Sequence, residues 1–347
     1  MNLLTLIWLS ALVLSGAALL LLLLLVVSRL FSGRRQRRLD ERRRALVRGV
    51  LSGKESPAEG LKRVPADIVA EIFTDLIRLV RGEERRAFVE QAQRLGVPDR
   101  LGRRLRSMSA RKRLVAAQSL GQFHDSDSLE RLHASLKDSN EDVRLAAALA
   151  LAEAGQTEDI HALVQELGLG TEEDSMLIVT LFRVIADERP EEIKALVAHP
   201  DTNLVARLAA IEALATTGDY SLVPTIVQLV LDAPDGAEEL PRYLRALGTI
   251  GHPAAMPAIM NGLDRPAVGA RATAAGAAGR IGLAGAGARL TELLDDPEWW
   301  VRFRAAEALV RIGGPAINRL RAVAADGSPR ARDAAATTLA EHGMAAA

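Results

Sequence analysis

Apolar residues recur along most of this chain at intervals of three and four positions, the spacing of an α-helix that buries one face. Two stretches show it most clearly, DVRLAAALALAEAG and WVRFRAAEALVRIG. The apolar faces are Val143, Ala147, Ala150, Leu151 and Ala154 in the first, and Val301, Ala305, Ala308, Leu309 and Ile312 in the second. A further helical segment precedes each of them, at 128–137 and 289–294. The pattern therefore predicts helical hairpins.

The hairpins recur at a fixed period. Asp, then Arg six positions later, then Gly eleven positions after that, occurs four times: Asp138/Arg144/Gly155, Asp201/Arg207/Gly218, Asp296/Arg302/Gly313 and Asp326/Arg332/Gly343. The arginine register extends through positions 113, 144, 176, 207, 240, 271, 302 and 332, with Met176 and Leu240 in place of arginine. We expect the Gly of each unit to end its helix in the left-handed conformation. A fixed period of this kind is typical of a solenoid, whose units bury their apolar faces by stacking.

These Ala-rich, Gly-terminated hairpins resemble HEAT repeats, of the short HEAT-like type also found in phycobilisome lyases. The resemblance covers residues 107–347 and implies an all-α fold, an α-solenoid of about eight hairpins. In that family the Asp and Arg form a ladder of hydrogen bonds between successive repeats. The resemblance therefore implies a structural role for Asp138, Arg144, Asp201, Arg207, Asp296, Arg302, Asp326 and Arg332. A row of arginines that binds phosphate is the alternative.

The N-terminus has a different pattern. Residues 1–28 contain no Asp, Glu, Lys or Arg, and 3–27 are almost wholly apolar. As a helix this segment would span roughly 38 Å, more than the ~30 Å hydrocarbon core of a bilayer. A cleaved signal peptide would have a basic start and a shorter apolar stretch, which favours an uncleaved transmembrane anchor here. Trp8 and Phe31 would lie near the two interfaces.

A basic neck follows the anchor. Residues 29–63 hold twelve Lys or Arg against four Asp or Glu, a net charge of +8, so the rest of the chain carries −8. Arginines beside a membrane stay on the cytoplasmic side, which predicts an inner-membrane protein of a bacterium with its N-terminus outside and its repeats in the cytoplasm. They also attract anionic lipid headgroups. The predicted membrane-surface residues are Arg34, Arg35, Arg37, Arg38, Arg42, Arg43 and Arg44.

The remaining boundaries follow from composition. Glycines and prolines between 49 and 65 predict a flexible linker, so the neck and linker together cover 29–65. Residues 66–106 show helical periodicity outside the repeat register and are expected to form a helical cap before the solenoid at 107–347. The glycines at 276, 279 and 282 are spaced in threes and follow no strand, which indicates close helix packing and not a phosphate-binding loop.

Composition limits the chemistry. Hydrophobic residues make up 49% of the chain and aromatic residues 3%, which favours thin, tightly packed helices. Cysteine is absent, which excludes disulfides, zinc–thiolate sites and thiol nucleophiles. The six histidines have no metal-ligand spacing, and no catalytic constellation occurs. We therefore expect no catalytic residue, cofactor or metal, and no enzymatic activity.

Trp299 and Trp300 stand where an earlier repeat has Glu141 and Asp142. Two interpretations remain open: the indoles pack against the next repeat, or they form an exposed aromatic anchor for a partner. The WWVR sequence also resembles a feature of bacterial membrane-anchored HEAT proteins associated with envelope glycosyltransferases.

These observations favour a membrane-anchored cytoplasmic scaffold that binds a protein partner through its repeats. A HEAT-like lyase or modification factor is the first alternative, and it would require a cleft that gathers His, acidic groups and one of the two tyrosines, Tyr220 or Tyr243. Binding of lipid or nucleic acid by the neck is the second. The acidic body and the lack of aromatics between the neck arginines argue against nucleic acid.

Overall fold

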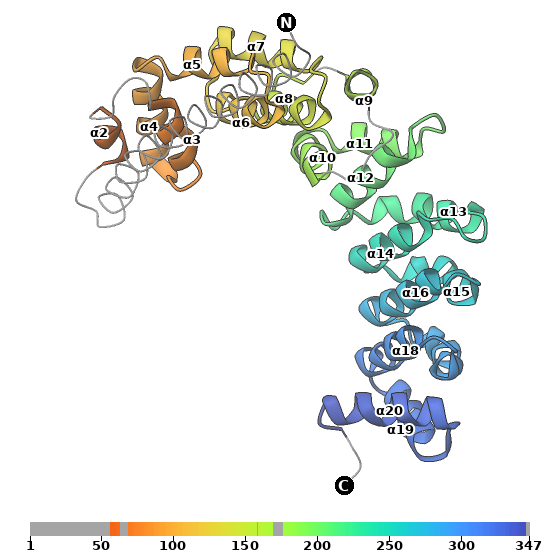
Figure 1. Cartoon of the computed structure of the whole chain (residues 1–347). Coiled ribbons are helices and arrows are strands. Elements are labelled where there is room, and N and C mark those ends of the chain that lie inside the picture. Colours follow the sequence, from red (N-terminus) through yellow and green to blue (C-terminus); the bar gives the residue numbers. More distant parts are fainter. Residues whose placement is uncertain (1–55, 63–68, 158, 169–175, 345–347) are drawn as a thin grey trace, which may run out of the picture. The chain divides into compact units, whose positions relative to one another are not determined.

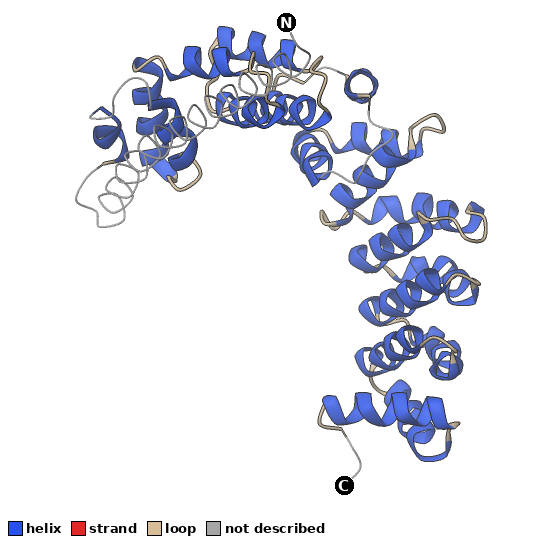
Figure 2. Cartoon of the chain, viewed as in Figure 1, coloured by secondary structure: helices blue, strands red, loops and turns tan. Residues whose placement is uncertain are grey.

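The computed structural model describes residues 56–62, 69–157, 159–168 and 176–344. Within these ranges every regular element is a helix and no β-strand occurs, which confirms the all-α class (Figure 2). The chain divides after Leu132 into two compact units, which are described separately. This division lies inside a helix, α7, and not at the expected boundary between cap and solenoid at 106.

The first unit contains a short helical array. Its helices are α2 (Pro57–Lys62), α3 (Val69–Leu76), α4 (Gly82–Arg94), α5 (Val97–Arg104) and α6 (Ala110–Leu120), followed by the start of α7 (Ser126–Ser135). Three buried phenyl rings form its core: the centroid of Phe73 lies 5.3 Å from that of Phe88 and 5.1 Å from that of Phe123. The described part of the segment expected to form a cap thus consists of α3, α4 and α5, joined by short turns.

The linker expected at 49–65 contains a helix. Pro57 is the first residue of α2, a position where its missing N–H costs nothing. Leu61 is fully buried, α2 packs against α4, and Lys62 pairs with Glu59 at 2.6 Å. A proline interpreted as a sign of flexibility here starts a helix.

The second unit is a stack of helical hairpins (Figure 1). Its helices are α8 (Glu141–Glu153), α9 (Ile160–Leu167), α10 (Met176–Glu188), α11 (Pro190–Ala198), α12 (Leu204–Ala215), α13 (Val223–Asp232), α14 (Leu240–Ile250), α15 (Met256–Asp264), α16 (Val268–Ile281), α17 (Gly287–Glu292), α18 (Trp299–Ile312), α19 (Pro315–Asp326) and α20 (Pro329–Glu341). Short 3₁₀ turns, η1 (Tyr220–Leu222), η2 (Pro253–Ala255), η3 (Ala284–Ala286) and η4 (Leu293–Asp295), lie between some of them. Each even-numbered helix from α8 to α18 packs against the next even-numbered helix, and together they form one layer. The odd-numbered helices form the other layer.

The repeat register agrees with the helices. All eight register positions, from 113 to 332, lie in even-numbered helices from α6 to α20, one in each. Six glycines at the repeat ends have positive φ: Gly155, Gly218, Gly251, Gly282, Gly313 and Gly343. Gly251 shows why: with φ 78° and ψ 21° it caps α14, and its N–H donates to the carbonyl of Leu247 at 3.0 Å. Gly313 departs from the predicted left-handed helical conformation, because its ψ is −168°.

Small residues set the distance between neighbouring helices. A Cβ atom placed on Gly279 of α16 would lie 2.7 Å from the Cα of Ala308 on α18. The close-packing role predicted for the glycines therefore holds at Gly279. Gly276 has no such neighbour, since the atoms nearest to its Cβ position are 3.9 and 4.0 Å away.

The predicted anchor at 1–28 and the neck arginines lie outside the described residues. Among the helices that are described, none is both long and apolar enough to cross a bilayer.

Candidate binding surface

An exposed aromatic cluster opens α18. It comprises Trp299, Trp300 and Phe303, and the two indole side chains are 62% and 39% exposed. The two indoles meet edge to face with centroids 5.2 Å apart, and the Phe303 ring stacks on Trp300 at 5.5 Å. Of the two interpretations left open by the sequence, the structure therefore shows exposure to solvent, with the rings ordered by one another.

The helix itself explains this exposure. Val301, Ala305 and Leu309 of α18 are buried against neighbouring helices. Positions 300, 304, 307 and 311 fall on a different face, because helical residues three or four apart are neighbours. The guanidinium of Arg304 accordingly lies over the Trp300 ring, 4.4 Å from its centroid, in a cation–π contact.

Arginines from three successive even-numbered helices lie near one another, and Arg304 connects them to the aromatic cluster. They are Arg245 on α14, Arg280 on α16, and Arg304 and Arg311 on α18, and we call them the arginine cluster. Burial lowers the pKa of the Arg280 guanidinium, and the positive charges of the other three lower it further. An arginine remains protonated at neutral pH in spite of such shifts, so the cluster carries four positive charges.

Few carboxylates offset these charges. Arg311 lies 3.7 Å from Glu307 on its own helix, in a pair that is partly exposed to solvent. In the part of the chain that the structure describes, no ion pair or side-chain hydrogen bond is found for Arg245, Arg280 or Arg304. The surface thus has a local excess of positive charge within a unit whose composition is not basic overall.

A missing side chain makes room for the guanidinium group of Arg280. A Cβ on Gly248 of α14 would lie 2.5 Å from Nη2 of Arg280, so Arg280 lies directly over that glycine. The Cδ of Arg304 is 4.0 Å from the Cβ position of Gly276. The arginine side chains therefore lie across neighbouring helices, and their forks are available to a planar anion such as a carboxylate or a phosphate.

The register arginines have a different setting, because each donates to backbone carbonyls in the turn before its own helix. The acceptors are Asp138 for Arg144, His199 and Pro200 for Arg207, Arg265 and Pro266 for Arg271, Asp296 and Pro297 for Arg302, and Gly327 for Arg332. Arg144 also reaches the carbonyl of Leu167 in the next repeat. These contacts hold the turns together.

The register aspartates lie in or beside the same turns. Asp138 and Asp296 each accept the N–H two residues later, from Asn140 and Glu298. Asp201 precedes α12 and Asp326 ends α19, and both are exposed.

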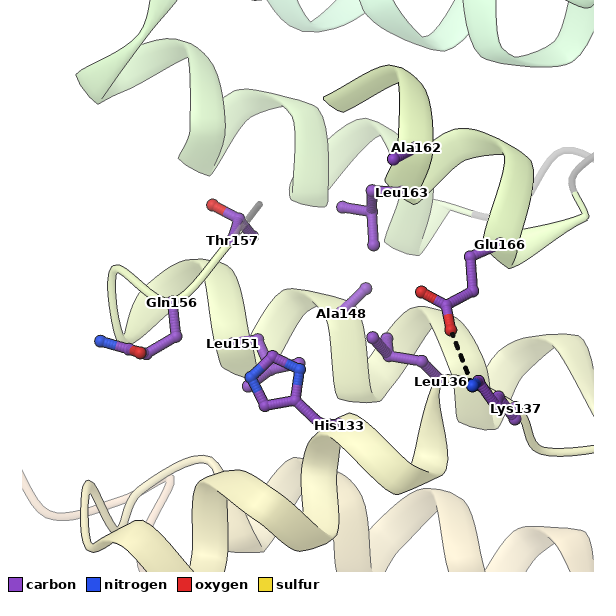
Figure 3. A pocket seen from close by; sticks show the side chains of 10 residues that line it. All are labelled: His133, Leu136, Lys137, Ala148, Leu151, Gln156, Thr157, Ala162, Leu163 and Glu166. Atoms are coloured by element: carbon purple, nitrogen blue, oxygen red, sulfur yellow. Dashed lines mark ion pairs between the residues drawn. The ribbon is translucent and has the colours of Figure 1, made fainter. Parts of the chain in front are cut away.

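A cavity of about 270 Å³ lies in the second unit near the end of α7, beside α8 and α9 (Figure 3). Leu136, Leu151 and Leu163 contribute apolar surface. His133 lines it as well, and Lys137 and Glu166 form an ion pair at 3.9 Å. Its volume lies just below the range for ligand pockets, roughly 300–1,000 Å³. No group of three His, Asp or Glu side chains that could hold a metal is found among the described residues.

The sequence pattern indicated the tryptophans but not the arginine cluster. A signal was present: Arg304 follows its register position by two, Arg245 by five, and Arg280 and Arg311 by nine. These offsets fall on one helical face, and comparing them between repeats would have brought the four arginines together.

The helical layers define an α-solenoid protein. The family profile described as HEAT repeats matches residues 98–177, 238–310 and 287–347, which is more than half of the chain. The chain belongs to the HEAT-repeat family.

Several solved structures are similar to this chain. The karyopherin Kap121p, bound to the extreme C-terminus of the protein phosphatase Cdc14p, is 14% identical with a TM-score of 0.47, over 87% of this chain and 40% of the karyopherin. Human deoxyhypusine hydroxylase is 18% identical with a TM-score of 0.32, over 71% of this chain and 96% of the enzyme. The CpcE–CpcF phycocyanin lyase of Nostoc sp. is 21% identical with a TM-score of 0.32, over 72% of this chain and 89% of that chain. The chain thus spans about two fifths of the karyopherin. No protein of curated function matches the sequence.

Proposed function

We propose that this protein is a membrane-tethered scaffold that binds a protein partner through its HEAT-repeat surface and catalyses no reaction itself. The observation that carries this proposal is the exposed aromatic cluster at the start of α18. Exposed tryptophans that are already ordered lose little conformational entropy on binding and bury a large apolar area, which is why they are frequent at the energetic centres of interfaces. The envelope glycosyltransferase system that the WWVR resemblance names is the first candidate for the partner.

The test is a crosslinked pull-down from native membranes, with the full-length chain as bait. The double variant Trp299→Ala/Trp300→Ala should lose a partner that the unchanged chain recovers. Tyr220→Ala is the matched control, because Tyr220 is 55% exposed but lies on η1, away from the aromatic cluster. Recovery of the same partners by the double variant would contradict the proposal, as would the absence of any reproducible partner.

The proposal places residues 1–28 across a bacterial inner membrane, with the repeats in the cytoplasm. The absence of cysteine makes this testable, because an engineered cysteine is then the sole thiol. Asn2→Cys should react with a membrane-impermeant maleimide in spheroplasts. Ser56→Cys, which is exposed, should react only after permeabilisation. The reverse labelling pattern would show that the topology is opposite to the proposed one. Labelling of both sites without permeabilisation would contradict the proposed transmembrane anchor.

The proposed lack of catalysis agrees with the setting of the two tyrosines. Tyr243 is buried, and burial raises the pKa of its phenol, while the exposed Tyr220 packs beside His252 with centroids 4.9 Å apart. Neither lines the cavity near α7. An enzyme of the lyase type would need a substrate-binding cleft, and a ligand found in that cavity by a small-molecule screen would reopen this alternative.

A further inference from the structure

We infer that the arginine cluster and the adjoining aromatic cluster form one binding site for an extended acidic segment of a protein partner, about six residues long. The inference rests on the proposed scaffold function and adds the chemistry of the partner. Carboxylates of the segment would pair with the guanidinium groups, and an apolar side chain would lie against the exposed indoles.

The arginine cluster brings like charges together. Of the four guanidinium groups, that of Arg311 has an ion pair among the described residues, with Glu307, and Glu212, which pairs with Arg242, lines a pocket together with Arg245. Like charges at this proximity repel one another, although Arg245, Arg280 and Arg311 are exposed, so that solvent and salt screen part of the repulsion. Nothing in the overall composition requires this, since the chain from residue 64 onward has a net charge of −8. A bound anion would remove the repulsion.

Arginines that stabilise the fold have a different environment from those of the arginine cluster. Arg265, 10% exposed, donates to the side chains of Asn261 and Asp235 and to the carbonyl of Val230. Arg242, on the same helix as Arg245, pairs with Glu212 at 3.3 Å. Structural arginines in this unit therefore have protein acceptors, whereas the described residues supply none for the side chains of Arg245, Arg280 and Arg304.

The size of the surface fits a short extended peptide. The cluster covers three adjacent helices, α14, α16 and α18, and helices pack with their axes about 8–10 Å apart. The site is therefore about 20 Å long, which matches about six residues of extended chain at ~3.3 Å each. A peptide also offers alternate side chains, so acidic groups can face the arginines while an apolar group reaches Trp300.

The distribution of charge along the solenoid favours a peptide over a nucleic acid. The face does not continue as a positive strip: the positions equivalent to Arg245 and Arg280 are Glu212 and Thr216 on α12, and Thr337 and Glu341 on α20. A nucleic acid carries phosphates at regular intervals and would meet these carboxylates on both sides. A short acidic segment ends before it reaches them.

The experiment measures binding of fluorescein-labelled probes to the full-length chain in phosphatidylcholine nanodiscs. The probes are an eight-residue peptide of Glu and Asp with one central Leu, the same peptide with Lys for each acidic residue, and a single-stranded oligonucleotide. Phosphatidylglycerol vesicles are added as a competitor. The acidic peptide should bind and should weaken as salt rises, because the contacts are ionic. The lysine peptide should not bind.

Variants locate the site. Arg280→Glu/Arg304→Glu should weaken the acidic peptide about tenfold or more, since each reversal replaces an attraction by a repulsion. Arg280→Lys/Arg304→Lys should weaken it less, because charge remains while the fork is lost. Arg319→Glu/Arg321→Glu on the exposed side of α19 is the matched control and should bind as the unchanged chain does. Replacement of the seven neck arginines by Gln should also leave peptide binding unchanged. Circular dichroism and the thermal midpoint show that each variant is folded.

Three outcomes would overturn the inference. The acidic peptide does not bind, or it binds Arg280→Glu/Arg304→Glu as tightly as the unchanged chain, or the oligonucleotide or the vesicles bind in a manner that depends on Arg280 and Arg304 while the peptide does not. The scaffold proposal has a separate readout. Suppose that a partner is lost in Trp299→Ala/Trp300→Ala but retained in Arg280→Glu/Arg304→Glu. This result would support the scaffold proposal and contradict the inference that the partner binds through an acidic segment.

Discussion

Arg271 and Asp296 join two successive repeats by a two-point ion pair. Nε and Nη2 of Arg271 donate to the two carboxylate oxygens of Asp296, at 2.8 and 3.1 Å, and the two side chains are 13% and 5% exposed. Asp296 also receives the N–H of Glu298, and its carbonyl accepts from Arg302. One residue thereby ties the turn before α18 to the helix of the preceding repeat.

Removing this carboxylate should destabilise the second unit strongly. Asp296→Ala leaves the guanidinium of Arg271 buried without its anionic partner, and such losses cost about 3–5 kcal/mol. Glu90→Ala is the control, because Glu90 and Arg94 form an exposed pair at 3.8 Å, and such pairs contribute at most about 1 kcal/mol. Urea unfolding of the detergent-solubilised chain measures both. Equal effects of the two substitutions would show that the Arg271–Asp296 pair contributes no more to the free energy of unfolding than an exposed pair does.

Two glycines of α16 should respond to alanine in opposite directions. Gly276→Ala should stabilise by about 0.5–1 kcal/mol, because its Cβ position is open and alanine lowers the entropy of the unfolded chain. Gly279→Ala should destabilise by about 1–3 kcal/mol, because the new methyl group would lie 2.7 Å from a backbone atom of α18. Thermal midpoints of the two variants provide the test. Destabilisation by both would mean that Gly276 also has a packing role.

This pair of glycines also shows what the sequence could predict. Their spacing indicated close helix packing, and the prediction is right for Gly279 alone. Both residues lie in the same helix and each follows an alanine, so the position of α18 is what distinguishes their packing. The helical hairpins, their period and the left-handed glycines follow from local pattern, because each is repeated several times in the chain.

The arginine cluster was harder to predict because it is not repeated. Its four members have three different offsets from the register and occur in three different helices. Residues that recur in every repeat are easily recognised as part of the pattern. Residues that occur in only one or two repeats, such as these arginines, are easily taken for random variation. Local sequence likewise left open whether Trp299 and Trp300 pack or protrude, since that depends on which face of α18 meets α16.

The charge at this surface should be visible in the fluorescence of the two indoles. An excess of positive charge concentrates anions locally, so iodide should quench Trp299 and Trp300 more strongly than caesium does. Trp8 is removed by Trp8→Phe, which leaves the pair as the sole tryptophans. In that background Arg280→Glu/Arg304→Glu should lower the iodide quenching constant and raise the caesium constant. Equal quenching by the two ions in the unchanged arginine cluster would contradict the local charge excess.

The contact between Lys194 and Asp219 should make stability depend on pH in the acidic range. Lys194 on α11 pairs with Asp219, which caps η1 of the following repeat. The hydrogen bond from Lys194, followed by that from the Ser221 N–H, lowers the pKa of the Asp219 carboxyl to about 2. An aspartate in an unfolded chain has a pKa of about 3.9. The folded form therefore binds the proton less readily than the unfolded form, and the stabilisation is complete above about pH 4 and is lost as the pH falls towards 2.

Asp219→Asn should reveal this window. The difference in unfolding free energy between the unchanged chain and the variant should be constant from pH 7 to about pH 4 and should shrink towards zero near pH 2. The difference in unfolding free energy between the unchanged chain and Lys194→Gln should depend on pH in the same way. The reason is that the Asp219 carboxyl then loses the partner that lowers its pKa most. Adding Asp219→Asn to Lys194→Gln should therefore have less effect than adding it to the unchanged chain. Urea midpoints between pH 2 and 7 measure all four proteins, and a difference that stays constant down to pH 2 would show that the pair does not control the ionisation of Asp219.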